Sequence, residues 1–321
     1  MSLEYDGTIH VLIYNGQFQE LKHRKRMPHG SFINMKIFLI GKNGQLGFFL
    51  EKTLRNNKFQ VFSYGREDLD IENFEKIKSE IESRSPDVVI NATAYHLVEQ
   101  CEENPEKAFI VNAVAVRNLA KICKERKIIF VTYSTDYVFD GLLGHAYDEN
   151  NEPNPLQVYG VSKLSGEFLT RNYCDKSFVI RTCGVYGGKL GSRSKKGNFI
   201  LNIMKQAQGK KTLKISSEQI VSPTYAPDLA IGTLELLKKM PPFGVYHLVN
   251  DGTCSWAEFA TEAFRKAHIK TKIIPIDRKG MVESVRKPLF SALKNKKAAK
   301  IGIVLPHWKD ALARYIKYLS V

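Results

Sequence analysis

The chain has 321 residues, a hydrophobic fraction of 43% and a formal net charge of +15. This length suffices for a substantial core, the composition is that of a globular protein, and no run of about 18 apolar residues predicts a membrane span. The five scattered cysteines lack C-x-x-C spacing and the start lacks a signal-peptide layout, so we expect a cytoplasmic protein with reduced thiols and no zinc site.

The excess of basic residues is concentrated in two stretches, 189–214 and 265–300. A field of this sign attracts anionic ligands. No helix-turn-helix, zinc-finger or RNA-stacking motif accompanies the charge, so we expect no nucleic-acid partner.

Residues 1–34 differ in pattern from the rest of the chain. They include a basic cluster at 22–26, and the regular alternation of elements starts only at Met35. We therefore interpret 1–34 as an N-terminal extension, either a mis-assigned start or a poorly ordered arm. Its apolar run at 10–14 could add an edge strand.

From Met35 onward, short β-prone apolar runs alternate with amphipathic helical patterns. The expected strands are 36–40, 60–63, 87–91, 128–133 and 177–181, and the expected helices are 45–56, 72–84, 105–126 and 158–173. This alternation predicts an α/β fold with a Rossmann-type, doubly wound parallel sheet covered by helices on both faces. After about residue 185 the rhythm becomes irregular, so we expect 185–321 to form mainly a smaller, substrate-binding lobe.

The first predicted strand runs directly into a glycine-rich turn at 41–47, Gly-Lys-Asn-Gly-Gln-Leu-Gly. Strand, glycine turn and helix in this order are typical of a loop that binds dinucleotide phosphates, which makes 35–184 a dinucleotide-binding domain. Gly41 allows the tight turn, Gly44 lets backbone N–H groups approach a pyrophosphate, and Gly47 lets the helix pack on the strand. The spacing departs from the dehydrogenase pattern G-x-G-x-x-G, so a structural turn is the alternative.

The later strands also end in small or polar residues. Parallel strands end at one edge of a sheet, where ligands bind, so we expect a single site there. The strand ends supply Tyr64, Gly65 and Arg66 with Asp68 and Asp70, then Ala92, Thr93, Ala94 and Tyr95, and then Ser134, Thr135, Asp136 and Tyr137.

Tyr159 and Lys163 lie four residues apart on a predicted helix, so their side chains project from one face. There the ammonium can lower the pKa of the phenol, which makes a proton donor that is usable near neutrality. A hydroxyl from Ser134 or Thr135 would give a substrate carbonyl its second hydrogen bond. Such a pair alone is often two solvated neighbours, and it gains weight here from the nucleotide-binding half before it.

Several strings together resemble the extended short-chain dehydrogenases/reductases, and specifically the dTDP-4-dehydrorhamnose reductase family. The resemblance runs from Met35 almost to the C-terminus. Its strings are Gly-Lys-Asn-Gly-Gln-Leu-Gly (41–47), Asp-Leu-Asp-Ile (68–71), Pro-Asp-Val-Val-Ile-Asn-Ala-Thr-Ala-Tyr (86–95), Val-Asn-Ala (111–113), Ser-Thr-Asp-Tyr-Val-Phe-Asp-Gly (134–141), Pro-Leu-Gln-Val-Tyr-Gly-Val-Ser-Lys-Leu-Ser-Gly-Glu (155–167), Arg-Thr-Cys-Gly-Val-Tyr-Gly (181–187), Gly-Asn-Phe (197–199), Ser-Pro-Thr (222–224) and Arg286-Lys287-Pro288.

The resemblance implies that a nicotinamide hydride reduces the 4-keto group of a nucleoside-diphosphate deoxysugar, in the biosynthesis of rhamnose or a related sugar of cell-surface polysaccharides. Thr135, Tyr159 and Lys163 would be catalytic: Tyr159 would donate a proton to the C4 oxygen, Lys163 would support the phenol and the nicotinamide ribose, and Thr135 would polarise the carbonyl. The implied substrate contacts are Thr135, Asp136, Tyr137, Tyr159 and Gly184. The implied cofactor contacts are Gly41, Asn43, Gly44, Gln45, Leu46, Arg66, Asp70, Ile71, Ala92, Ala94, Tyr95, Asn112, Tyr159 and Lys163. For Asn112, a helix-packing role is the alternative.

The choice of cofactor depends on the end of the second strand. A basic residue there tolerates the 2′-phosphate of NADPH, whereas an acidic residue favours NADH. Arg66 is followed directly by Glu67 and Asp68, and we predict NADPH with NADH also possible. Some relatives form a homodimer that uses a divalent cation such as Mg²⁺, but no ligand cluster in this sequence identifies a metal site.

Gly184 departs from the family pattern, because relatives often carry a tryptophan there, against the sugar. Loss of a large aromatic ring predicts a wider pocket or a different sugar. Two other functions stay open. One is a sugar-nucleotide epimerase or dehydratase, although dehydratases typically carry Asp-Glu where this chain has Asp136-Tyr137. The other is a non-catalytic regulatory subunit on the same scaffold, like that of methionine adenosyltransferase.

Overall fold

The computed structural model describes residues 13–14, 17–18, 35–189, 197–277 and 285–320. Its contacts divide the chain into two units, Met1–Ile33 and Asn34–Val321. This boundary lies one residue from the predicted end of the extension.

In the first unit, strands β1 (Ile13–Tyr14) and β2 (Gln17–Phe18) pair in antiparallel orientation. We predicted that the run at 10–14 could add an edge strand. Its described residues, Ile13 and Tyr14, pair with β2 and not with the central sheet.

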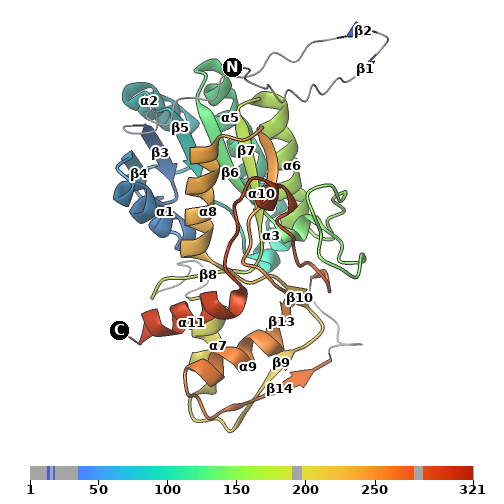
Figure 1. Ribbon diagram of the computed structural model, residues 1–321. Helices are drawn as coiled ribbons and strands as arrows, with labels where there is room; N and C mark the ends of the chain where they lie inside the picture. Colours follow the sequence, from blue (N-terminus) through green and yellow to red (C-terminus); the bar gives the residue numbers. More distant parts are fainter. Residues whose placement is uncertain (1–12, 15–16, 19–34, 190–196, 278–284, 321) are drawn as a thin grey trace, which may run out of the picture. The chain divides into compact units, whose positions relative to one another are not determined.

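A six-stranded parallel sheet forms the centre of the second unit (Figure 1). In spatial order its strands are β12 (Gly244–His247), β7 (Ser177–Thr182), β6 (Ile129–Thr135), β5 (Val88–Asn91), β3 (Lys36–Ile40) and β4 (Gln60–Tyr64). The chain runs outward from β3 in both directions, which confirms the doubly wound sheet. The five predicted strands are confirmed to within two residues at each end. The sixth, β12, comes from the segment that we expected mainly to form the smaller lobe.

Helices pack on the sheet in pairs, with α1 against α8 and α5 against α6. The bounds are α1 (Gln45–Asn56), α2 (Phe74–Arg84), α3 (Val98–Glu103), α4 (Pro105–Phe109), α5 (Ala115–Glu125), α6 (Val158–Tyr173) and α8 (Ala226–Lys239). The predicted helix at 105–126 is interrupted by a π-helical turn at Ile110–Val114. Within the described residues, no helix combines the length and apolarity needed to cross a bilayer.

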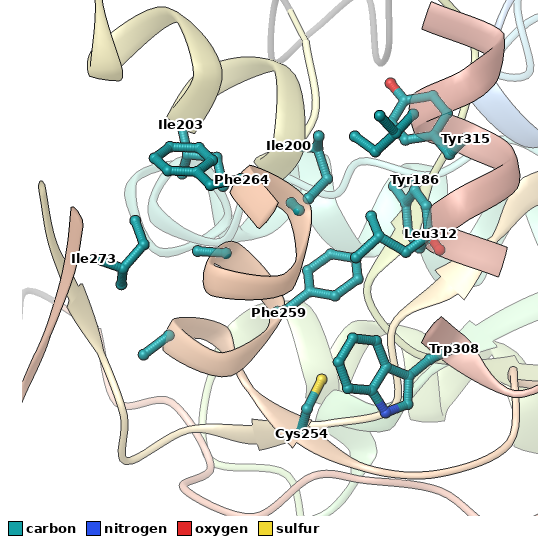
Figure 2. Packing of buried hydrophobic residues seen from close by; sticks show 14 of the residues in the cluster. Tyr186, Ile200, Ile203, Cys254, Phe259, Phe264, Ile273, Trp308, Leu312 and Tyr315 are labelled. Atoms are coloured by element: carbon teal, nitrogen blue, oxygen red, sulfur yellow. The ribbon is translucent and has the colours of Figure 1, made fainter. Parts of the chain in front are cut away.

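The smaller lobe lies beyond the carboxyl ends of the strands and has an aromatic-rich core (Figures 1 and 2). At its centre the ring of Phe259 lies 5.2 Å from that of Tyr186 and 5.7 Å from that of Trp308. The elements of the lobe and its connections are β8 (Val185–Tyr186), α7 (Phe199–Ala207), β9 (Thr212–Ser216), β10 (Ile220–Val221), β11 (Thr224–Tyr225), β13 (Cys254–Ser255), α9 (Trp256–Lys266), β14 (Lys272–Ile276), α10 (Lys296–Lys300) and α11 (Trp308–Leu319).

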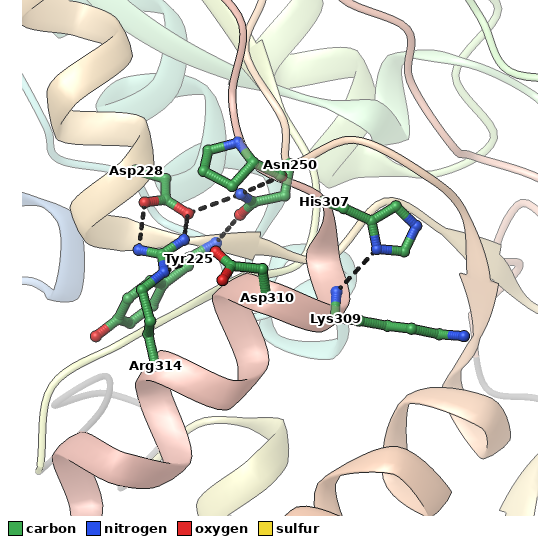
Figure 3. A network of polar contacts seen from close by, with 8 residues as sticks. Tyr225, Asp228, Asn250, His307, Lys309, Asp310 and Arg314 are labelled. Carbon is green, nitrogen blue, oxygen red and sulfur yellow. Dashed lines mark hydrogen bonds and ion pairs between the residues drawn. The ribbon is translucent and has the colours of Figure 1, made fainter.

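A buried carboxylate fastens the lobe to the sheet domain (Figure 3). Both oxygens of Asp228, in the first turn of α8, accept hydrogen bonds from the guanidinium of Arg314 on α11, each at 2.7 Å. Asn250 donates to the same carboxylate and accepts from the backbone N–H of Tyr225. Charged bidentate contacts of this kind fix the relative orientation of the two side chains. The network therefore holds α11 of the lobe in a fixed position against α8.

Candidate active site

A cavity of about 920 Å³ extends along the carboxyl ends of the strands and into the smaller lobe. Every residue predicted to contact the cofactor or the substrate lines this cavity except Asn112, whereas Gly47, Tyr64, Gly65 and Asp68 of the glycine loop and strand ends do not line it. The predicted residues in its wall are Gly41, Asn43, Gly44, Gln45, Leu46, Arg66, Asp70, Ile71, Ala92, Ala94, Tyr95, Thr135, Asp136, Tyr137, Tyr159, Lys163 and Gly184. The structure thus brings these residues to one edge of the sheet, while their individual roles remain predictions.

The glycine loop has the geometry of a phosphate cradle. Gly41 has a φ of +96°, which disfavours other residues, and a Cβ added to Gly47 would overlap the carbonyl oxygen of Gly41. Helix α1 starts directly after Gly44, which has no side chain to cap it. The first backbone N–H groups of α1 are therefore available to an anion, as a dinucleotide pyrophosphate requires.

Two buried hydroxyls in the wall add to this fit. Among the described residues, Ser134 Oγ and Thr182 Oγ1 find no hydrogen-bond partner although both side chains are buried. Both residues line the cavity. Since buried polar groups are normally paired, these hydroxyls suit a ligand that brings hydrogen-bonding groups of its own.

The side chain of Gln45 points toward the lobe. Its Oε1 accepts hydrogen bonds from the backbone N–H of Gly187, at 3.1 Å, and from the side chain of Asn198, at 3.2 Å. The predicted cofactor contact of Gln45 is therefore left to its backbone, while its amide side chain ties the glycine loop to the lobe.

Arg66 lies at the edge of the cavity with its side chain 74% exposed and its Nε 3.2 Å from Asp70 Oδ2. The acidic neighbour Asp68 is bound to the Lys42 ammonium at 2.7 Å and to the backbone N–H of Gly65. The hydrogen bond from Lys42 lowers the pKa of Asp68. The Arg66 guanidinium is thus more accessible than the Asp68 carboxylate to a 2′-phosphate or a hydroxyl of the cofactor ribose.

Asn112 is buried behind the cavity wall and binds the backbone of the wall residue Tyr95. It lies in the π-helical turn, where its Oδ1 accepts from the backbone N–H of Tyr95 and its Nδ2 donates to the Tyr95 carbonyl and to Ser162 Oγ, at 2.9 to 3.0 Å. Ser162 belongs to α6, the helix that also carries Tyr159. The structure thus shows the packing role of Asn112, which holds the cavity-lining backbone of Tyr95 against α6, while its predicted contact with the cofactor stays a prediction.

The ammonium of Lys163 does not lower the pKa of the Tyr159 phenol, contrary to our expectation. Burial raises the pKa of Tyr159, and a hydrogen bond with Thr135 opposes this only in part. The Lys163 Nζ donates instead to the Tyr133 carbonyl at 2.6 Å. Burial lowers the pKa of Lys163 to about 8, with the charge of Glu167 acting in the opposite direction. The phenol is consequently a proton donor at neutral pH.

Asp136 is held by protein groups on both of its oxygens. Its Oδ2 accepts from Ser291 Oγ at 2.5 Å, and its Oδ1 accepts from Thr135 Oγ1 at 3.1 Å. Burial raises its pKa, with the hydrogen bonds from Ser291, Cys183 and Thr135 opposing. Asp136 therefore positions the Thr135 hydroxyl, and Ser291 is a site residue that the sequence did not reveal.

The pocket is not open beside Gly184, where we expected extra width. Gly184 has a φ of +53°, and a Cβ added to it would lie 3.1 Å from Cη2 of Trp256. The indole of Trp256, at the start of α9, occupies this space.

The lobe supplies wall residues that sequence reasoning missed. They come from segments far apart in the chain, and only Arg-Thr-Cys-Gly-Val-Tyr-Gly at 181–187 and Gly-Asn-Phe at 197–199 gave a local signal. These residues are Val185, Tyr186, Asn198, Phe199, Asn202, Val221, Trp256 and Phe259.

Charged and metal-ligating groups are sparse in this part of the wall. Residues 190–196 of the basic stretch lie outside the described residues, and the other lysines of 189–214 do not line the cavity. In the described ranges, no group of three or more His, Cys, Asp and Glu residues is arranged to hold a metal ion.

Comparison with known proteins gave consistent matches over this unit. Residues 35–321 match the family model described as "RmlD substrate binding domain". The spore coat polysaccharide biosynthesis protein SpsK of Bacillus subtilis is 33% identical over 285 residues, which cover 89% of this chain and 98% of that protein. The dTDP-4-dehydrorhamnose reductase of Escherichia coli is 32% identical over 299 residues, with the same coverage. The crystal structure of dTDP-4-dehydrorhamnose reductase from Bacillus anthracis in complex with NADP is 29% identical, with a TM-score of 0.83 over 89% of this chain and 99% of that one.

Proposed function

The chain belongs to the RmlD family, and from this membership and its site we propose that it reduces the keto group of a nucleotide-linked 4-keto-deoxysugar with NADPH. The observation that carries the proposal is that Thr135, Tyr159 and Lys163 lie in one cavity with the glycine loop. The product would serve the synthesis of rhamnose or a related deoxysugar for surface polysaccharides, in the cytoplasm.

When bound, NADPH supplies the hydride that is added to the sugar carbon. The phenol of Tyr159, which is protonated at neutral pH, donates its proton to the carbonyl oxygen. Thr135 Oγ1 donates to Asp136 Oδ1 in the ligand-free site, and its hydroxyl hydrogen would turn to the carbonyl oxygen when the substrate binds. Lys163, whose ammonium is anchored on the Tyr133 carbonyl, would bind the cofactor ribose.

The site supports reduction better than the two alternatives. Asp136 is engaged by Ser291 and Thr135 and is followed by Tyr137, so the pair of acids needed for elimination is not present at this point of the wall. A non-catalytic subunit would have no need for the complete trio of Thr135, Tyr159 and Lys163.

A spectrophotometric assay of NADPH oxidation tests the proposal. Purified protein is mixed with a series of 4-keto-deoxysugars attached to different nucleoside diphosphates, with and without Mg²⁺. We expect oxidation of NADPH with at least one of them. If none is reduced, the proposed function is wrong, and tightly bound NAD in the purified protein would instead favour an epimerase.

Replacing Arg66 by alanine should raise the KM for NADPH by about tenfold, because a charge-assisted hydrogen bond to the 2′-phosphate is worth roughly 1.4 kcal/mol. The KM for NADH should change little. Steady-state kinetics with each cofactor measure this difference. Lys52→Ala, which removes an exposed cation of α1 outside the cavity, is the control. Equal effects on both cofactors would show that Arg66 does not recognise the phosphate.

A further inference from the structure

The indole of Trp256 lies at the end of the cavity that contains the predicted catalytic residues. The ring is half-buried and lines the wall, next to Gly184. Gly184 follows Thr182 by two residues, and Thr182 is the register partner of Thr135 across β6 and β7. The indole therefore borders the part of the cavity next to the ends of β6 and β7, where the reacting carbon must lie.

The position of the indole is fixed by its surroundings. Its ring centre lies 4.5 Å from that of Phe199, at the start of α7. The residue before it, Ser255, forms a capping box with Glu258: the Ser255 Oγ accepts from the Glu258 N–H, and the Glu258 carboxylate accepts from the Ser255 N–H. A pre-formed aromatic surface of this kind binds a ring with little loss of side-chain entropy.

The chemistry of the lobe wall suits a neutral sugar. Among the described residues, those that the lobe contributes carry no charge, and Trp256, Phe199 and Val221 are apolar. Asn198 and Asn202 are its amides. Diphosphates need charged or N–H partners, and none of the described lobe residues in the wall has a charged side chain, whereas the C–H face and methyl group of a deoxyhexose pack well against an aromatic ring.

From this geometry, and resting on the proposed function, we infer that Trp256 is a specificity-determining residue whose indole packs against the deoxysugar ring. Gly184 is small because the indole fills the space beside it. A nucleobase is the other ring that could stack here, but it is separated from the reacting carbon by the sugar and the diphosphate. The nucleobase is therefore placed farther from Thr135 than this indole.

Kinetics of Trp256→Ala and Trp256→Phe test the inference. For the alanine variant we expect the KM for the 4-keto nucleotide sugar to rise about tenfold or more, and for the phenylalanine variant by only a fewfold. The inhibition constant of the sugar-free nucleoside diphosphate and the KM for NADPH should stay at the wild-type values. A parallel rise in all three constants would mean that Trp256 has only a structural role. If the KM for the nucleotide sugar and the inhibition constant of the nucleoside diphosphate both rise while the KM for NADPH is unchanged, the indole contacts the nucleobase and not the sugar.

Fluorescence gives an independent measurement, because the chain has only two tryptophans. Trp308, the other one, is buried in the lobe core. Saturation with a nucleotide-linked deoxyhexose should change the emission of the wild type but not that of Trp256→Phe, and the sugar-free diphosphate should change neither. An unchanged wild-type signal, or an equal change in the variant, would overturn the inference. Wild-type turnover reports on the proposed function separately, so the two failures are distinguishable.

Discussion

Replacement of Tyr159 by phenylalanine is expected to lower kcat roughly 10³-fold, within the range that a positioned proton donor contributes. Only the hydroxyl is lost, so the cavity keeps its shape and the dissociation constant of NADPH should change less than twofold. The hydroxyl is protonated at neutral pH, as an ordinary phenol is, and burial raises its pKa further. Stopped-flow measurement of NADPH oxidation, together with a binding titration of NADPH, gives both quantities.

The matched control is Tyr173→Phe, which removes the same atom from an exposed tyrosine at the end of α6. Its kinetics should equal those of the wild type. A Tyr159→Phe protein with more than a tenth of wild-type activity would show that another group, or water, delivers the proton.

The parts of the fold that could be predicted are those set by local pattern. Strand β3, the glycine loop and α1 follow one another without a gap, and their bounds agree with the prediction. Strand β12 was missed because its place beside β7 depends on contacts with residues distant in the sequence. The π-helical turn was missed for a related reason, since the sequence does not show that Asn112 binds both Tyr95 and Ser162.

The residues of the candidate site likewise fall into those that could be predicted from the sequence and those that could not. Residues that follow a parallel strand, such as Thr135, could be assigned to one edge because the topology alone brings them together. Trp256 and Ser291 could not be assigned in this way, because only the folding of the lobe brings Trp256 to the cavity and only the folding of the C-terminal segment brings Ser291 to Asp136. The pKa of Tyr159 was predicted in the wrong direction, because sequence spacing shows that Lys163 is near but does not show how deeply the phenol is buried.

Replacement of Glu167 by glutamine is expected to be strongly destabilising, because it removes the partner of a buried cation. The side chains of Arg181 and Glu167 are only 4% and 2% exposed, and the guanidinium donates to both carboxylate oxygens at 2.7 to 3.1 Å. Removing one partner of such a buried pair typically lowers the free energy of unfolding by about 3–5 kcal/mol. Urea denaturation measures the free energy of unfolding. The double variant Glu167→Met with Arg181→Met should recover most of the loss, and a double variant less stable than the single one would contradict this account.

The same substitution should change the pH dependence of turnover. Glu167 lies one helical turn from Lys163, and its charge raises the pKa of that ammonium, which burial has lowered to about 8. If turnover needs protonated Lys163, kcat of the wild type falls as pH rises through about 8. Without the carboxylate the pKa of Lys163 drops further, so the fall in kcat should begin at lower pH. A pH profile of kcat at a temperature well below the melting point of the variant measures this shift, and an unmoved alkaline limb would show that Glu167 does not tune Lys163.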